Sequence, residues 1–459
     1  MGNAVSGFRR MMFCCLMVMA LAFPFVPLQA RDDATDQVSS VSEDAEETFT
    51  EDIGESVDPF GEKGPHFTFG GQYKHLLTFQ RIDNFRGDDP LASKKKNLIA
   101  DLNRVRLSPE FRYSDIILIH VDWDNEIILG SYNKSYEFDA YWRGSDYNDF
   151  FDLSWEPYHG SDVYYRTRIH RAYMKISVWN FTFTLGRQQI RFGSGRLWNP
   201  LDILNPISPT FVEGAEDQSG TDAFRMDYYI NEVTELTLVS NQKKCNDRYS
   251  DMKIDDSNTV LRLTMTIHET ELSILAAWIS RRAVAGIDVA SIVADGTLRG
   301  SVLYSYPKID GRWYFQASAG YEYTFNGGVY FLVEYFYNQN GINFNRKLEG
   351  AYIDSFINGW NQHNYLYLAN QFLTMNQHYA GLALGYDFMP LLRGEFFAIY
   401  DFQGYGLFFT PSLKYSAKEN LDIYGGIMFG FTFDGAPQTS DFESFKEPFM
   451  YYAALSYYF

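Results

Sequence analysis

The chain ends with the stretch Phe449-Met450-Tyr451-Tyr452-Ala453-Ala454-Leu455-Ser456-Tyr457-Tyr458-Phe459. Every second residue, counted back from Phe459, is apolar or aromatic. Because the side chains of a β-strand alternate between its two faces, this pattern predicts a strand with one apolar face. At the free end of a soluble protein, such a strand invites pairing with other chains. A closed membrane barrel removes that edge by pairing its last strand with its first, here near His66 to Arg81.

An ending with alternate aromatic residues and a terminal Phe resembles the last strand of bacterial outer-membrane barrels. The resemblance implies that the barrel-assembly machinery of that membrane recognises Phe459, Tyr457 and Leu455. A soluble β-sandwich that happens to end on a strand is the alternative interpretation.

The first thirty residues carry the features of a secretory signal peptide. Arg9 and Arg10 precede an apolar run, and Ala30 ends an imperfect small-residue cleavage site. Residues 31–64 hold twelve Asp or Glu but only two basic residues, so we expect a disordered periplasmic arm there. The arm is either a solvated spacer or a contact for a periplasmic partner.

Residues 65–459 are predicted to form one barrel domain. Aromatic residues make up 18% of the chain, which suits the aromatic girdles of a barrel at both membrane interfaces. After the signal peptide no apolar run approaches about 18 residues, so no transmembrane helix is expected. The net charge of -19 excludes a strongly basic surface for nucleic acid. Without the signal peptide Cys245 is the only cysteine, so it forms no internal disulfide.

The periodicity predicts an all-β fold, a single closed antiparallel transmembrane barrel of about eighteen strands. The predicted strands are 66–81, 98–113, 116–131, 163–177, 180–190, 222–230, 234–242, 258–268, 270–281, 285–293, 297–306, 312–324, 328–339, 377–388, 391–402, 406–416, 420–433 and 447–459.

Short connections such as Trp179-Asn180 alternate with connections that are often long, such as 191–221. This alternation predicts short periplasmic turns, long extracellular loops and both termini on the periplasmic side. Pro109 and Pro411 fall inside predicted strands. Proline removes a donor from the hydrogen-bond ladder, so we expect each of them at a β-bulge.

Charged residues gather on one face of the predicted strands 98–113 and 116–131, and apolar residues on the other. Apolar residues that face the membrane and charged residues that face the interior are expected of a barrel with a water-filled lumen. The predicted lumen wall carries a basic row, Arg104, Arg106 and Arg112, beside an acidic row, Asp122, Asp124 and Glu126. The two rows either create a transverse field that selects solutes or pair with each other and stiffen the wall.

A distinctive motif begins with Gly186-Arg187-Gln188 at the end of a predicted strand. A Gly-rich turn with Arg196 follows, and then Trp198-Asn199-Pro200-Leu201-Asp202. The strand end and the turn resemble the alginate-export family of outer-membrane barrels, in which an 18-stranded barrel carries an anionic polysaccharide through an arginine-lined lumen. The step from Trp198 to Asp202 is similar to related porin-like barrels. The lumen arginines implied by this resemblance are Arg104, Arg106, Arg166, Arg168, Arg187, Arg191 and Arg196.

The connection 191–221, which includes Trp198 and Asp202, is long enough to fold into the lumen and narrow it. The alternative is a structured extracellular loop. The acidic aromatic stretch from Glu137 to Asp152 is either a weak calcium site or a solvated surface loop, and its spacing matches no known calcium motif. No catalytic, metal or phosphate-binding motif is visible, so neither an enzyme nor a cofactor is predicted.

These features predict a passive outer-membrane channel for hydrophilic solutes, embedded among outer-membrane lipids. Two alternatives stay open. One is a dedicated exporter of an anionic polysaccharide, and the other is a barrel enzyme or adhesin that acts through its loops.

Overall fold

The computed structural model describes residues 65–83, 95–135, 138, 150–204, 220–241, 257–279, 282–307, 313–339, 341, 374, 376–437, 440–442 and 447–459. The predicted signal peptide and acidic arm, Cys245 and most of the stretch from Glu137 to Asp152 lie outside these residues. Within the described part, no helix is long and apolar enough to cross a membrane.

Nineteen strands and one short 3₁₀-helix, η1 (Ser131–Lys134), make up the regular structure of the described residues. The strands are β1 (Pro65–Asp83), β2 (Lys95–Tyr113), β3 (Ile117–Leu129), β4 (Ser154–His159), β5 (Val163–Val178), β6 (Phe181–Gln188), β7 (Thr221–Asn231), β8 (Thr234–Asn241), β9 (Asn258–Ile267), β10 (Thr270–Ile279), β11 (Arg282–Val293), β12 (Gly296–Pro307), β13 (Tyr314–Thr324), β14 (Tyr330–Asn338), β15 (His378–Met389), β16 (Leu392–Asp401), β17 (Gly406–Lys418), β18 (Leu421–Thr432) and β19 (Glu447–Tyr458).

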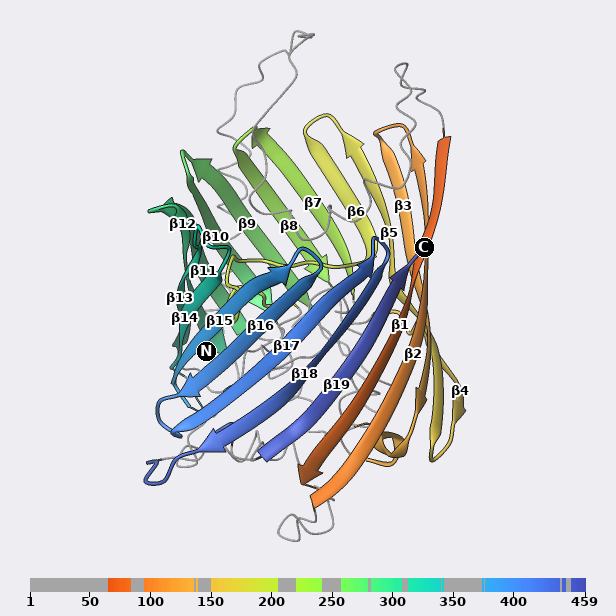
Figure 1. Ribbon diagram of the computed structural model, residues 1–459. Coiled ribbons are helices and arrows are strands. Elements are labelled where there is room, and N and C mark those ends of the chain that lie inside the picture. The colour runs from red at the N-terminus through yellow and green to blue at the C-terminus, as the bar shows by residue number, and fades with distance from the viewer. Residues whose placement is uncertain are drawn as a thin grey trace. The chain divides into compact units, whose positions relative to one another are not determined.

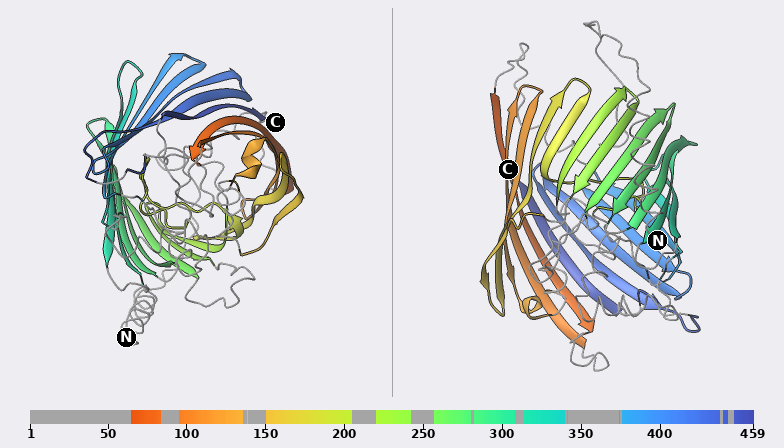
Figure 2. Two further views of the ribbon diagram at one scale, coloured as in Figure 1. Left: turned by 90° about the horizontal axis from the view of Figure 1, so that it is seen from below. Right: turned by 180° about the vertical axis from the view of Figure 1, so that it is seen from behind.

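These strands form one antiparallel sheet that closes on itself, since β1 pairs with both β2 and β19. Figure 1 shows β1 and β19 side by side, and the left view of Figure 2 looks into the closed ring. Strand β3 pairs directly with β5, so β4 stands outside a ring of eighteen strands. The predicted eighteen-stranded closed barrel is confirmed, with one extra strand.

The sequence prediction missed β4, which falls in the connection 132–162. This strand is short, contains Pro157 and has no alternating apolar pattern. Its register against β5 shifts between Trp155 and Tyr158, next to the proline that cannot donate to a ladder. It pairs with β5 on the edge that β6 leaves uncovered, because β6 pairs with only the Ala172–Val178 part of β5.

The predicted alternation of faces appears in the burial of strands such as β3. In β3, Ile119, Trp123 and Ile127 are each about two-fifths exposed on the outer face, whereas Asp124 and Glu126 on the inner face are fully buried. The hydrocarbon core of a bilayer has no hydrogen-bonding groups, so only an apolar strand face is suited to contact it.

The two internal prolines are accommodated without an extra residue, so the predicted bulges are wrong. Pro109 pairs in register with Phe69 on β1, and the β2–β3 pairing is interrupted beside it without a shift. Pro411 behaves in the same way between Phe396 on β16 and the neighbouring β18. In each case, the missing N–H falls on the side where the ladder is interrupted, so no bulge is needed.

The last residue closes the barrel. The N–H of Phe459 donates to the carbonyl oxygen of Gly71 at 3.0 Å, and the N–H of Gly71 donates back at 2.8 Å. A Cβ on Gly71 would meet the ring of Phe459 at 2.6 Å, so glycine makes room for the terminal aromatic ring. Tyr457 and Leu455 face outward opposite Tyr73 and His75, as the alternation predicted.

Candidate functional site

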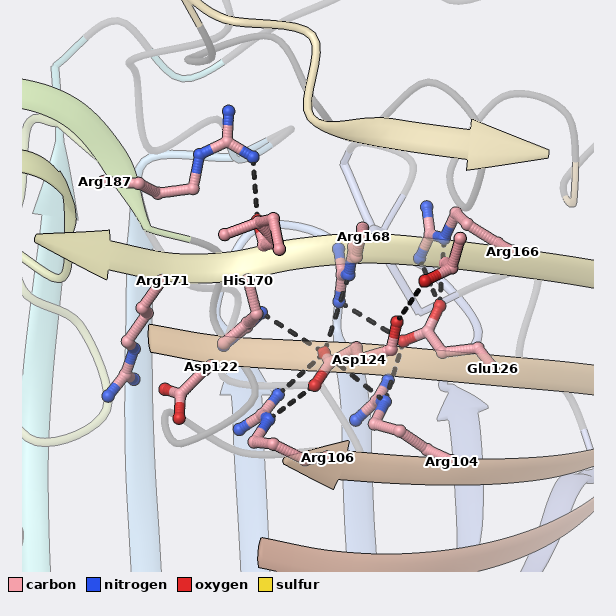
Figure 3. Close-up of polar contacts among 12 residues, drawn as sticks. Arg104, Arg106, Asp122, Asp124, Glu126, Arg166, Arg168, His170, Arg171 and Arg187 are labelled. Carbon is pink, nitrogen blue, oxygen red and sulfur yellow. Dashed lines mark hydrogen bonds and ion pairs between the residues drawn. The ribbon is translucent and has the colours of Figure 1, made fainter. Parts of the chain in front are cut away.

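The inner face of β2, β3 and β5 carries a compact set of charges. We call this set the charged wall, and its members are Arg104, Arg106, Asp124, Glu126, Arg166 and Arg168. The register places Glu126 between Arg104 and Arg166, and Asp124 between Arg106 and Arg168. Asp124 and Glu126 therefore each have a basic residue on both neighbouring strands (Figure 3).

Glu126 binds three guanidinium groups. Its Oε1 accepts from Nε of Arg104 at 2.7 Å and from Nη2 of Arg168 at 3.4 Å. Its Oε2 accepts from Nε and Nη2 of Arg166 at 2.9 and 2.7 Å. Hydrogen bonds in which both partners are charged are the strongest kind available to a side chain.

Asp124 lies at the centre of the set in Figure 3. It accepts two hydrogen bonds from Arg106, at 2.6 and 3.0 Å. Nε of Arg104 and Nε of Arg168 lie 3.9 and 3.7 Å from Oδ2 of Asp124. Asp124 and Glu126 thus bind arginines on both neighbouring strands. This is the arrangement expected if the predicted basic and acidic rows pair with each other.

Burial decides what the charged wall can contact. The side chains of Asp124 and Glu126 are fully buried, and even the most exposed arginine, Arg106, shows only 11% of its side chain. Charges that are covered and paired in this way leave little surface for direct contact with a solute.

Two predicted members of the rows do not join the charged wall. Asp122 accepts from Oγ of Ser108 at 2.6 Å and lies 3.1 Å from Nε2 of His120. Arg112 lies nearer the turn between β2 and β3, where it pairs with Glu110 at 3.0 Å and keeps 58% of its side chain exposed. Arg112 has Leu118 as its cross-strand partner, so the predicted row of three arginines does not face a row of three acids.

His170 on β5 is a buried wall residue that the sequence prediction missed. The register shifts there, since Trp123 pairs with Ile169 while Asp122 pairs with Arg171. His170 is the extra residue of this bulge, and its Nδ1 lies 3.6 Å from Oδ2 of Asp124. Two adjacent polar residues in an alternating strand, His170 and Arg171, are the sequence signal for the bulge.

Arg187 lies apart from the charged wall in Figure 3. Its guanidinium forms two hydrogen bonds with Asp222 on β7, at 2.9 and 3.0 Å. It also donates to the carbonyl oxygens of Phe151 and Ile169, at 2.6 and 2.9 Å. Arg187 therefore ties the end of β6 to β5, β7 and the approach to β4.

Residues 189–204 leave the wall after β6 and turn inward. We call them the inward segment. Its apolar residues Phe192 and Leu201 pack in one cluster with inward-facing residues of β7 to β12, which include Val239, Val260 and Leu303. The left view of Figure 2 shows this segment inside the ring. The part of the predicted connection from 205 to 219 lies outside the described residues.

Two carboxylates of the opposite wall hold the inward segment by its backbone. Glu334 on β14 accepts from three successive N–H groups, those of Arg196, Leu197 and Trp198, at 3.1, 3.3 and 2.6 Å. Asp288 on β11 accepts from the N–H and the hydroxyl of Ser194, both at 3.1 Å. We call Glu334 and Asp288 the latch carboxylates.

Trp198 anchors the same segment by packing. Its side chain is buried and stacks on Phe336 of β14 with ring centroids 5.5 Å apart. A Cβ on Gly381 would meet this ring at 2.9 Å, so a glycine on β15 provides the space for it. Gly193 has a φ of +82°, and Nδ2 of Asn199 closes the loop by donating to the carbonyl oxygens of Phe192 and Gly193.

The two arginines that the sequence predicted in this segment stay accessible. Arg196 shows 51% of its side chain while Nε lies 3.2 Å from Glu322. Arg191 shows 42%, and its Nε lies 3.9 Å from the buried Asp202. Among the described residues, no group of three or more His, Cys, Asp or Glu could hold a metal ion.

Comparisons with known proteins bear on the fold. A scan of protein families and a search of curated proteins find no match. Among solved structures the chain is similar to OccK8 (OprE) of Pseudomonas aeruginosa, at 10% identity, covering 86% of this chain and 98% of that chain with a TM-score of 0.51. OccK7 (OpdD) of the same organism is 11% identical, with 86% and 98% covered and a TM-score of 0.49. A triple mutant of the Rhodopseudomonas blastica porin is 10% identical, with 86% and 100% covered and a TM-score of 0.40.

These comparisons do not show the alginate-export family, so that resemblance stays a prediction. At such low identity, the likeness to OccK8 establishes the fold alone. Together with the closed ring and its apolar outer face, it shows that this chain has the fold of a porin-like outer-membrane β-barrel.

Proposed function

We propose that this barrel is a passive channel for hydrophilic solutes and that the inward segment narrows it. The observation that carries the proposal is the double attachment of residues 189–204 to the inner wall, by the latch carboxylates and by Trp198. A segment held inside the barrel reduces the passage without any moving part. The proposed channel uses no cofactor.

Charge preference in this proposal comes from the accessible arginines and not from the charged wall. Arg191 and Arg196 are about half exposed, whereas Arg104, Arg166 and Arg168 are buried against acids. Charges that line a constriction affect which ions pass. We expect Arg191 and Arg196 to favour the entry of anions.

Single-channel recording in planar bilayers tests the proposal. The wild-type protein should give discrete conductance steps, and Arg196→Ala should shift the reversal potential in a salt gradient toward cation preference. Lys134→Ala is the matched control, because Lys134 is half exposed in η1 rather than on the inward segment. A barrel that carries no ionic current would contradict the channel.

A dedicated exporter of an anionic polysaccharide is the second candidate. It would need accessible arginines along the lumen. Of the seven arginines implied by the alginate-export resemblance, Arg191 and Arg196 are the accessible ones, so the observed burial does not favour an exporter. An enzyme or adhesin that acts through its loops has no supporting contact among the described residues.

The last strand bears on assembly. We propose that Phe459, Tyr457 and Leu455, which face outward at the closing seam, are read by the barrel-assembly machinery. Deletion of Phe459 should lower the amount of heat-modifiable barrel in the outer membrane, and normal amounts would contradict this role.

A further inference from the structure

The bulge of β5 at His170 lies where three connections of the chain meet. The N–H of Ile169 donates to the carbonyl oxygen of Leu153 at 2.9 Å, and Arg187 donates to the carbonyl oxygen of Ile169 at 2.9 Å. The N–H of Gly220, the residue before β7, donates to the carbonyl oxygen of His170 at 3.3 Å. A Cβ on Gly220 would meet the side chain of Arg187 at 2.7 Å, so only glycine allows this close approach. The bulge therefore joins β5 to the approach to β4, the end of β6 and the start of β7.

The same bulge decides the direction of Arg171. Before the bulge, odd-numbered residues of β5 such as Val163 face outward, and after it even-numbered residues such as Met174 do, each with 37% exposure. Side chains alternate along a regular strand, so without a bulge at His170 Arg171 would share the outer face with Val163. With the bulge, Arg171 lies opposite Asp122 and faces the interior.

Arg171 binds the first residue of the inward segment. Its Nη2 donates to Oε1 of Gln189. Figure 3 shows Arg171 on β5 beside the charged wall. Two residues before Gln189, Arg187 binds Asp222 on β7. The point at which the inward segment leaves the wall is therefore held from β5 on one side and from β7 on the other.

The imidazole of His170 does not account for the bulge. It is fully buried, and neither of its ring nitrogens has a hydrogen-bond partner within the part of the chain that the structure describes. Its Nδ1 lies 3.6 Å from Oδ2 of Asp124, which is too far for a hydrogen bond. What the extra residue provides is its carbonyl oxygen and the direction of the residue that follows it.

We infer that Arg171 is a positioning residue for the inward segment and fixes the direction in which residues 189–204 leave the wall. This inference rests on the proposed function, in which that segment narrows the channel. The latch carboxylates and Trp198 hold the segment farther along, and Arg171 holds its start. Hydrogen bonds from an arginine are strong and directional. Loss of this one would free the start of the segment while the latch carboxylates still hold its middle.

The reactivity of a buried thiol tests the inference. Ile190 follows Gln189, shows 1% of its surface and packs in the apolar cluster of the segment. In a Cys245→Ser background, Ile190→Cys should react slowly with a water-soluble maleimide in the folded barrel. Addition of Arg171→Met should speed the reaction by about tenfold or more, because loss of a hydrogen bond from a charged group shifts local opening by roughly that factor. The protein without Ile190→Cys gives the background rate.

Further variants show whether the effect belongs to the contact. Lys175→Met removes another basic side chain from the inner face of β5, opposite Leu118, and should leave the reaction slow. Arg171→Gln combined with Gln189→Arg exchanges the donor and the acceptor, and should restore the slow rate that Arg171→Gln alone loses. Gln189→Ala removes the same contact from the side of the segment and carries the test if Arg171→Met does not assemble.

The thiol reaction needs no ionic current, so a barrel that does not conduct would contradict the proposed channel and leave this test intact. In a conducting barrel, Arg171→Met should also increase the noise of the open-channel current, while the heat-modifiable barrel still forms. Three results would overturn the inference. These are a reaction that stays slow when Arg171 or Gln189 is replaced, a reaction that is equally fast in Lys175→Met, and a fast reaction that the exchange does not slow.

Discussion

The charged wall and the latch carboxylates face the same lumen, and both bury carboxylates, but the acids have different partners. Asp124 and Glu126 bind guanidinium groups on the neighbouring strands. Glu334 and Asp288 bind the backbone N–H groups of a segment that enters from the far side of the ring. The first arrangement joins strands to each other, and the second fixes what lies inside them. The position of a buried acid on the inner face therefore does not reveal whether it pairs with a neighbouring strand or holds the inward segment.

The largest effect is expected when Glu126 is removed from the charged wall. Glu126→Ala would remove the carboxylate that the buried Arg104 and Arg166 each bind at 2.7 Å. Removal of one partner from a buried ion pair costs about 3–5 kcal/mol, so the free energy of unfolding in urea and lipid vesicles should fall by that amount.

The matched control for Glu126 is an acid with half of its side chain in water. Glu395 pairs with Arg393 at 2.9 Å and shows 52% of its side chain. Glu395→Ala should cost at most about 1 kcal/mol. Equal losses for Glu126 and Glu395 would show that burial of the charged wall does not matter for stability.

Trp198 is the corresponding test on the inward segment. Trp198→Ala should cost about 3 kcal/mol, through lost burial and the cavity beside Phe336. Because the ring of strands does not depend on Trp198, we expect the conductance to rise and its noise to increase while the barrel stays assembled. Trp179→Ala is the control, since Trp179 is 94% exposed in a turn, and it should change neither quantity.

Glu334→Gln tests the hydrogen bonds of the latch carboxylates separately from the packing of Trp198. The amide keeps the size of the side chain and one acceptor oxygen but loses the charge that serves three N–H groups. We expect a loss of about 1–3 kcal/mol and more frequent conductance substates, with Trp198 fluorescence reporting a looser segment. An unchanged single-channel record would mean that packing alone holds the segment.

The sequence predicted the wall well, for a physical reason. Strand alternation decides which way a side chain faces. The eighteen strands, the closing pair and the inward direction of Asp124 and Glu126 could therefore all be predicted from the sequence. Alternation contains no information on side chains that leave the pattern. The short strand β4 and the unshifted register at Pro109 depend on how neighbouring strands fit together.

The candidate site was predicted only in part. Arg191, Trp198 and Asp202 were identified as members of an inward connection, but Glu334 and Asp288 were not, because they are distant in sequence and bind backbone. The contact between His75 and Asp101 was not predicted either, because only the register of β1 and β2 brings these two side chains together.

The smallest effect is expected at an ion pair outside the wall. Nζ of Lys134 lies 2.7 Å from Oδ1 of Asp162, and both side chains are more than half exposed. The hydrogen bond from Lys134 lowers the pKa of the Asp162 carboxyl below its ordinary value. A lowered folded-state pKa contributes stability above the unfolded pKa, near pH 4, and that contribution is lost as the pH falls through the folded value.

Lys134→Ala should therefore leave the urea midpoint unchanged at pH 7 within error, because water already solvates both groups well. Any small difference from wild type should shrink further at pH 3, where Asp162 is increasingly protonated in both proteins. A measurable loss at pH 7 that persists at pH 3 would assign Lys134 a contact other than Asp162. It would also weaken the distinction between buried and exposed charges on which the difference from Glu126 rests.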